Sequence, residues 1–242
     1  TIPQKVVRKD VVYDVVAIGD STFYDSRSLS SITIPEGVVS IGEYSLSSCN
    51  YLKTVSLPTT LTSIGEGAFY WSQRITEIAI PDNVESVGAE AFFGCMGLTE
   101  VCLPVGITSI EEGTFRQCES LAKVSIPSSV TYIANNAFLY SALKDVVIPA
   151  SVTMIGERAF KCDELGKVVA EGTVPAEAVA IAFGDEYGAV PADAVLYVPA
   201  GSKKGYSEAV GWNRFTNIVE LKTGDTNHDD VIDEADVENL AE

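Results

Sequence analysis

Histidine is almost absent from this sequence, since His228 is the only one among 242 residues. Histidine is the side chain that most often serves as a general base near neutral pH, so its scarcity leaves few routes to a catalytic pair. His228 also lies in an acidic C-terminal tail, away from the serines and cysteines of the repeats described below. The chain contains no G-x-S-x-G elbow, phosphate loop or dinucleotide fingerprint. We therefore expect a non-catalytic protein.

Positive charge and long apolar runs are scarce as well. There are 16 Lys and Arg residues against 34 Asp and Glu, which gives a net charge of −18 and a pI of about 4.3. Phosphate backbones and anionic membrane surfaces repel such a chain, so we expect no nucleic-acid partner. The longest uncharged apolar stretch, Ala178–Phe183, is far shorter than the roughly 20 residues of a membrane span. We expect no transmembrane segment.

The dominant feature is an internal repeat. Prolines recur at 35, 58, 81, 104, 127 and 149, at intervals of 23, 23, 23, 23 and 22 residues. A bulky apolar residue recurs in the same register at Phe23, Leu46, Phe69, Phe92, Phe115, Phe138 and Phe160. Two independent markers with one period indicate a stacked repeat protein in which each unit contacts its neighbours.

The residues of one unit predict its path. Val55 and Leu57 alternate with Ser56, which is the pattern of a short strand with one apolar face. Pro58 then ends the strand because it has no amide hydrogen. Further on, the Ala68-Phe69 pair is expected in a helical turn, with the ring filling the core. The fold class is thus an α/β solenoid, a right-handed stack of units of about 23 residues with short strands and helical turns.

Two recurring small residues need interpretation. Glycine follows isoleucine in several units, but Glu111 and Ala134 occupy the same slot, so we expect a tight ordinary turn rather than a left-handed one. Cysteine follows the aromatic position at Cys49, Cys95, Cys118 and Cys162, where other units have Ser26, Ser72 and Ser141. We interpret that column as buried thiols rather than a metal ladder or a redox pair. Cys102 differs, because it lies on the outward face of a strand.

The outward strand positions form two columns that are candidates for ligand binding. The first contains small residues, and its candidates are Ser56, Ala79, Cys102, Ser125 and Val147. The second contains charged and polar residues, and its candidates are Thr54, Glu77, Glu100, Lys123 and Asp145. A flat face of small residues beside charges suits a protein or glycan ligand better than an enclosed small molecule. A generic solvated sheet face is the alternative interpretation.

The pattern L-x-x-V-x-I-P-x-x-V-x-x-I-G-x-x-A-F-x-x-C, from about Ile18 to Cys162, resembles the BspA-like leucine-rich-repeat family of bacterial surface proteins. The segment Leu196–Ser202, followed by Tyr206, Trp212 and Phe215, resembles the C-terminal ending of that family. The resemblance implies a secreted or cell-surface protein that binds or adheres through its solenoid face, without a reaction. We expect the solenoid to cover residues 1–221, with a cap over about 171–221 in which Trp212 and Phe215 close the core.

Composition changes in the tail, residues 222–242. Oxygen donors are spaced as in a 12-residue calcium loop, in which the candidate ligands are Asp225, Asn227, Asp229, the backbone carbonyl of Val231, Asp233 and Asp236. A glycine is usual at the sixth position, where this loop has Asp230. Calcium is therefore the one cofactor that the sequence suggests, and a solvated acidic tail is the alternative.

Aspartate at the last loop position resembles a dockerin repeat, of which the sequence contains one where a dockerin has two. The resemblance implies a cohesin-like partner for the tail. A module docked on a multi-protein scaffold is thus the alternative to a surface-binding protein.

Overall fold

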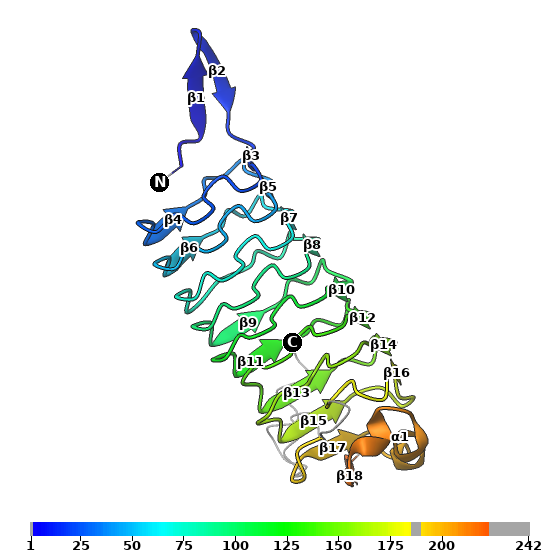
Figure 1. Ribbon diagram of the computed structural model, residues 1–242. Coiled ribbons are helices and arrows are strands. Elements are labelled where there is room, and N and C mark those ends of the chain that lie inside the picture. Colours follow the sequence, from blue (N-terminus) through cyan, green and yellow to red (C-terminus); the bar gives the residue numbers. More distant parts are fainter. Residues whose placement is uncertain (1, 185–189, 223–242) are drawn as a thin grey trace.

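The structure is a computed structural model that describes residues 2–184 and 190–222. Coils stack into an elongated solenoid, with a hairpin at the N-terminal end and a small helical cap at the C-terminal end (Figure 1). The predicted solenoid is confirmed, and its coils have the predicted length of roughly 23 residues, because strand partners lie 22 or 23 residues apart in most pairs. The acidic tail with its candidate calcium ligands lies outside the described residues.

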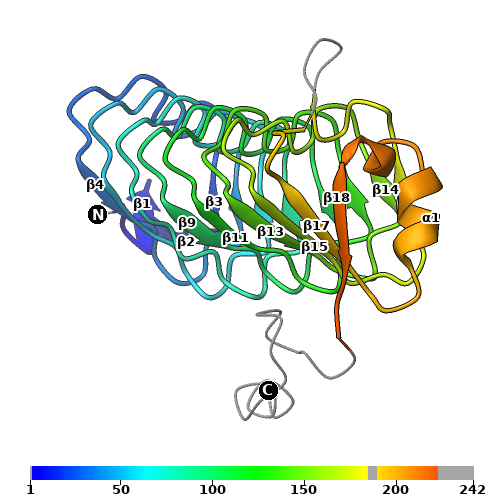
Figure 2. The same ribbon diagram turned by 90° about the horizontal axis from the view of Figure 1, so that it is seen from below.

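The strand before each proline forms the first face of the solenoid, which we call the strand face. Figure 2 shows β9, β11, β13, β15, β17 and β18 following one another along the stack. The strand face comprises β4 (Ser31–Thr33), β6 (Thr54–Ser56), β9 (Glu100–Cys102), β11 (Lys123–Ser125), β13 (Asp145–Ile148), β15 (Lys167–Ala170), β17 (Val195–Val198) and β18 (Asn217–Glu220). Every paired strand on it is parallel to its neighbour, because each coil repeats the path of the one before.

A second row of shorter strands runs along the solenoid. Its two-residue strands are β3 (Ala17–Ile18), β5 (Ser40–Ile41), β7 (Ser63–Ile64), β8 (Ser86–Val87), β10 (Ser109–Ile110), β12 (Tyr132–Ile133), β14 (Met154–Ile155) and β16 (Glu177–Ala178). The row is divided into two four-stranded sheets between β8 and β10. In all but the last of these strands, the second residue is a buried isoleucine or valine, which adds to the core.

The third side of each coil, which we call the turn ridge, contains the aromatic position. It was expected to be a helical turn, but consecutive turns replace a helix there. The Phe69 amide donates to the carbonyl of Ala91 in the next coil (2.8 Å), whereas the Tyr70 amide donates to Gly67 in its own coil (2.9 Å). Amides that would bond within the segment in a helix thus donate to carbonyls of the next coil instead, so no helix forms here.

Two positions of most ridge turns have a left-handed backbone. One is represented by Tyr44 (φ 51°) and Gly67 (φ 56°), the other by Trp71 (φ 55°) and Gly94 (φ 69°). The glycine after isoleucine is not among these positions, so the expected ordinary turn is confirmed. That glycine is needed for close stacking, because a Cβ on Gly88 would lie 2.5 Å from the Glu66 nitrogen of the preceding coil.

The core is a column of stacked rings. Phe69, Phe92, Phe115, Phe138, Phe160 and Phe183 are buried, and successive centroids lie 5.2–5.6 Å apart with interplanar angles of 1–12°. Beside them, the cysteine column is buried as predicted. The Cys95 and Cys118 thiols each donate to a ridge carbonyl of the preceding coil, at 3.3 and 3.2 Å, and Ser72 makes the same bond at 2.7 Å. A small donor in this slot therefore satisfies a buried carbonyl.

The C-terminal cap contains α1 (Lys203–Glu208) and the 3₁₀ turn η1 (Trp212–Arg214). Trp212 and Phe215 pack on Phe183, with centroids 4.8 and 5.1 Å from its ring. The Trp212 indole nitrogen donates to the Ala176 carbonyl (2.8 Å), so the polar edge of this buried ring has a partner. The predicted capping role of both aromatic residues is confirmed.

A feature that the repeat pattern did not predict is an N-terminal hairpin. Strands β1 (Lys5–Arg8) and β2 (Val11–Asp14) pair antiparallel around Lys9-Asp10, both of which have positive φ. The hairpin projects from the first coil, and all eight of its strand residues are exposed (Figure 1).

Candidate binding trough on the strand face

The ten candidate ligand residues lie where the sequence predicts them. All ten are exposed. The strand register places Thr54 beside Ser31, Lys123 beside Glu100 and Ser125 beside Cys102. The residue between each outward pair points inward, as Val101 and Val146 do at 2% exposure. The two predicted columns are therefore real features of the strand face.

Two hollows lie end to end along this face. The larger, of about 570 Å³, extends from β9 to β15 and is floored by small or aliphatic residues such as Cys102, Ser125 and Val147. The smaller, of about 400 Å³, extends from β6 to β9 and includes Thr54, Glu77 and Ala79. Glu100 and Cys102 line both hollows, which therefore adjoin at these residues, and we call the pair of hollows the strand-face trough. Ser56 is the one predicted candidate that lines neither.

The larger hollow coincides with an irregularity of the repeat. Among the described residues, the ladder of the strand face is interrupted twice. One gap lies between β6 and β9, where the coil of Glu77 to Ala79 forms no strand, and the other lies between β11 and β13, although these two strands keep their own ladders with β9 and β15. The connection into β13 is one residue shorter than its equivalent one coil earlier: Ser141 to Leu143 replaces Cys118 to Leu121. The sequence shows the proline spacing of 22 at this point, but it does not show that the sheet breaks there.

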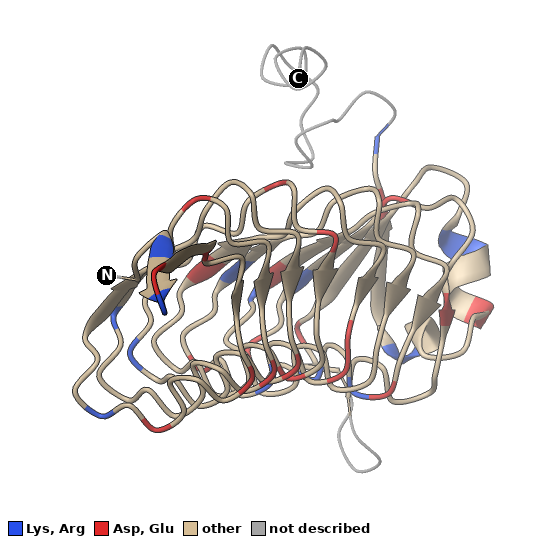
Figure 3. Ribbon diagram, turned by 90° about the horizontal axis from the view of Figure 1, so that it is seen from above, with Lys and Arg blue, Asp and Glu red and all other residues tan. Residues whose placement is uncertain are grey.

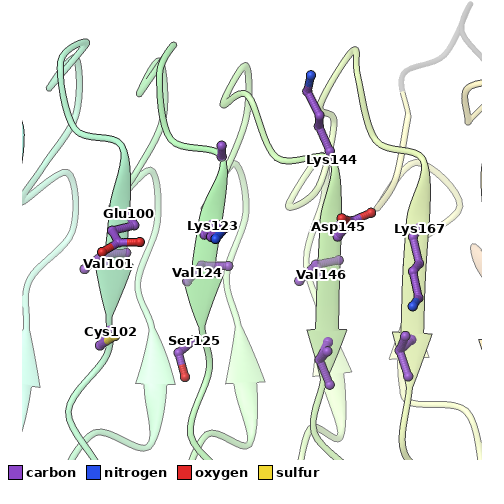
Figure 4. A pocket seen from close by; sticks show the side chains of 13 residues that line it. Glu100, Val101, Cys102, Lys123, Val124, Ser125, Lys144, Asp145, Val146 and Lys167 are labelled. Carbon is purple, nitrogen blue, oxygen red and sulfur yellow. The ribbon is translucent and has the colours of Figure 1, made fainter. Parts of the chain in front are cut away.

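Charges of opposite sign alternate along one wall of the larger hollow. Lys123 is the cross-strand neighbour of Glu100, and Asp145 is the neighbour of Lys167. Figure 4 shows these four side chains at one level of the strands, with Cys102 and Ser125 at the next level. Lys167 also places its ammonium 5.2 Å from the centre of the Tyr197 ring. Opposite charges side by side stabilise a sheet modestly and present both signs to a ligand.

Cys102 is the only described thiol exposed in this trough, and the other cysteines are chemically quiet. Burial raises the pKa of the Cys95 thiol to about 12 and that of Cys162 to about 11. Burial, with the neighbouring Cys95, also raises the pKa of Cys118. A thiol that stays protonated is a poor nucleophile and a poor metal ligand, so the column acts as core.

The described residues show neither a clustered metal site nor a membrane-spanning helix. Within 2–184 and 190–222, no group of three or more His, Cys, Asp and Glu side chains is arranged to hold a metal. Over the same residues, no helix is long and apolar enough to cross a membrane. The predicted calcium ligands from Asp225 to Asp236, and His228, fall outside this part of the chain and stay predictions.

Comparison with known proteins agrees with this architecture. A family model described as "BspA type Leucine rich repeat region" matches six copies over residues 16–101 and 62–176. The search of curated proteins found no significant match.

Several solved structures are similar. A leucine rich cell surface protein from Faecalibacterium prausnitzii A2-165 is 28% identical with a TM-score of 0.68 over 91% of this chain, which spans only 64% of that protein. A leucine-rich repeat protein from Bacteroides ovatus (22% identity, TM-score 0.50) aligns over 91% of this chain and 68% of its own. The T. pallidum Leucine Rich Repeat protein (23% identity, TM-score 0.57) aligns over 76% and 88%. With the family repeats matched over most of its length, this chain belongs to the BspA-type leucine-rich-repeat family.

Proposed function

We propose that this chain is a non-catalytic recognition protein of the bacterial surface or extracellular space, and that it adheres to a protein partner through the strand-face trough. The observation that carries the proposal is that the two hollows adjoin along β6 to β15, with Glu100 and Cys102 lining both. The family, whose solenoids are commonly surface or binding proteins, supports the location and the absence of catalysis.

The dimensions of the trough suit an extended peptide segment. Five coil-to-coil steps separate Thr54 from Lys167, and at about 4.8 Å a step they span roughly 24 Å. An extended chain covers that length with about seven residues. Small floor residues such as Ala79 and Ser125 let a peptide backbone approach the sheet closely.

The charge pattern favours a polypeptide over a glycan. Glu100 beside Lys123, and Asp145 beside Lys167, offer partners to side chains of both signs. A polypeptide carries both signs at the spacing of its side chains, so it complements this mixed pattern better than a neutral glycan does.

Selection from a library of random displayed 12-residue peptides tests this proposal. Peptides enriched on the full chain should bind at least tenfold more weakly to Val147→Asp and to Lys123→Glu. Ser86→Glu, on the second row of strands, is the matched control and should bind them as the unaltered chain does. Enriched peptides that respond to none of the trough substitutions, or to the control equally, would contradict the proposal.

A further inference from the structure

Three aromatic side chains on the turn ridge are not required by the repeat. Tyr44 occupies a left-handed slot that other coils fill with Ser21, Gly67, Glu90, Gly113, Asn136 and Arg158. Trp71 occupies a second left-handed slot, filled elsewhere by Asp25, Ser48, Gly94, Gln117 and Tyr140. Since these slots accept small, polar and charged residues in other coils, the backbone conformation does not itself require an aromatic ring at either position. The third, Tyr70, lies between them and is partly exposed.

The two rings in left-handed slots lie over glycines of the next coil. A Cβ added to Gly67 would meet Tyr44 Cε1 at 2.3 Å, and one added to Gly94 would meet Trp71 Cδ2 at 3.0 Å. Neither glycine has a side chain to lift the ring off the backbone. Tyr44 and Trp71 are only partly buried, so each ring keeps part of its surface open to solvent.

The rings hold one another in place. Tyr70 packs edge-to-face with Tyr44 at 6.0 Å and with Trp71 at 6.5 Å between centroids. Behind it, Phe93 stacks on Tyr70 at 4.8 Å, and the Arg116 guanidinium lies 5.2 Å from the centre of the Phe93 ring. The arrangement is therefore fixed before any ligand binds, which lowers the entropy cost of binding.

A carboxylate that can accept hydrogen bonds lies beside the rings, and further carboxylates lie along the same side of the solenoid. The Tyr44 hydroxyl donates to Glu66 Oε1 at 2.7 Å, and the Glu66 side chain is exposed. Acidic residues follow the short strands along this side of the solenoid (Figure 3), and Glu43 and Glu112 are among those exposed there. Carboxylates accept hydrogen bonds from hydroxyl groups and repel anions. The surroundings thus suit an uncharged ligand with many hydroxyls.

We propose that Tyr44, Tyr70 and Trp71 form a carbohydrate-binding platform for a neutral glycan, separate from the strand-face trough. The apolar C–H face of a pyranose ring packs on the exposed faces of Tyr44 and Trp71. Its hydroxyls donate to Glu66 and neighbouring carboxylates. A neutral glycan satisfies both the apolar rings and the acceptors, whereas an acidic glycan would be repelled by a chain of net charge −18.

Affinity electrophoresis of the full chain tests the platform, with four soluble neutral polysaccharides in the gel: a mixed-linkage β-glucan, a xylan, a galactomannan and an arabinogalactan. At least one should retard the unaltered chain. Trp71→Ser and Tyr44→Ser place in each slot a residue that another coil carries there, and each should weaken that binding at least tenfold. Tyr140→Ser is the matched control, because Tyr140 occupies the Trp71 slot three coils on, where the Lys161 ammonium lies 5.8 Å from its ring centre.

The outcomes separate this platform from the trough. Val147→Asp should leave retardation unchanged, and thermal unfolding of each variant shows whether it is folded. The proposal is overturned if none of the four polysaccharides retards the chain, or if Tyr140→Ser weakens binding as much as Trp71→Ser. It is also overturned if a decalysine peptide binds in a Trp71-dependent way and the polysaccharides do not, since the rings would then recognise a cation.

Discussion

Phe115 is the third of the six rings in the phenylalanine column, and Phe115→Ala should be among the most destabilising single changes in this protein. Its side chain is fully buried, and its ring stacks on Phe92 and on Phe138 at 5.4 Å on each side. Removing a buried phenylalanine costs about 3–5 kcal/mol of unfolding free energy. Each stacked pair adds about 0.5–1.5 kcal/mol beyond burial, so we expect the upper end of that range.

The same slot at the end of the stack provides an internal comparison. Phe23 is only partly buried, and its neighbour in the column is Leu46 instead of a second ring. Phe23→Ala should therefore cost only about 1–2 kcal/mol, in line with partial burial. Phe115→Leu keeps most of the volume and should cost about 1.5 kcal/mol or less.

Urea unfolding measures these differences, and the two tryptophans report on different regions. Trp71 lies on the turn ridge of an early coil, and Trp212 is buried in the cap. Because each coil contacts only its neighbours, loss of the Phe115 ring should also separate the two fluorescence transitions. If Phe115→Ala costs no more than Phe23→Ala, the column of rings does not couple the coils and this reasoning is wrong.

Three further predictions concern other parts of the chain. Gly88→Ala should lower stability by about 1–3 kcal/mol in urea unfolding, since its Cβ would lie 2.5 Å from backbone, while Gly166→Ala, with 3.8 Å of room, should be nearly neutral. Among the cysteines of the described residues, only Cys102 should react with a thiol reagent while the protein is folded. Burial raises the pKa of Cys95 from 9.0 to about 12, so the free energy of unfolding should be highest below pH 9 and fall as the pH rises toward 12, and Cys95→Ser should reduce that fall. Calorimetry of the full chain should detect calcium binding that Asp229→Ala abolishes, and no heat at millimolar calcium would contradict the calcium loop.

Much of the architecture could be read from the sequence because a stack has one repeating register. A period of 23 residues places Glu100 beside Lys123 and Cys102 beside Ser125 once the coils are parallel, and the structure confirms both pairs. Burial of the cysteine column followed from its place after the aromatic position. The capping role of Trp212 followed from the need to cover the last coil.

Local backbone geometry was predicted less well. The segment around Phe69 was expected to be helical, yet its amides alternate between its own coil and the next. Helix propensity describes hydrogen bonds within one segment, and it does not account for competition from a neighbouring coil. The N-terminal hairpin was missed for a related reason, since its valines do not follow the repeat period.

The sequence by itself therefore determined the period, the inward and outward faces and the two candidate columns, because these depend only on which residues recur every 23 positions. Only the tertiary structure decided that the strand ladder breaks beside β13, and that Tyr44 and Trp71 lie over glycines one coil away. Those features depend on small offsets between neighbouring coils and on the direction of side chains at left-handed positions. A hydrophobic period specifies which side of a coil faces the core, but it does not specify how one coil's surface lies against the next.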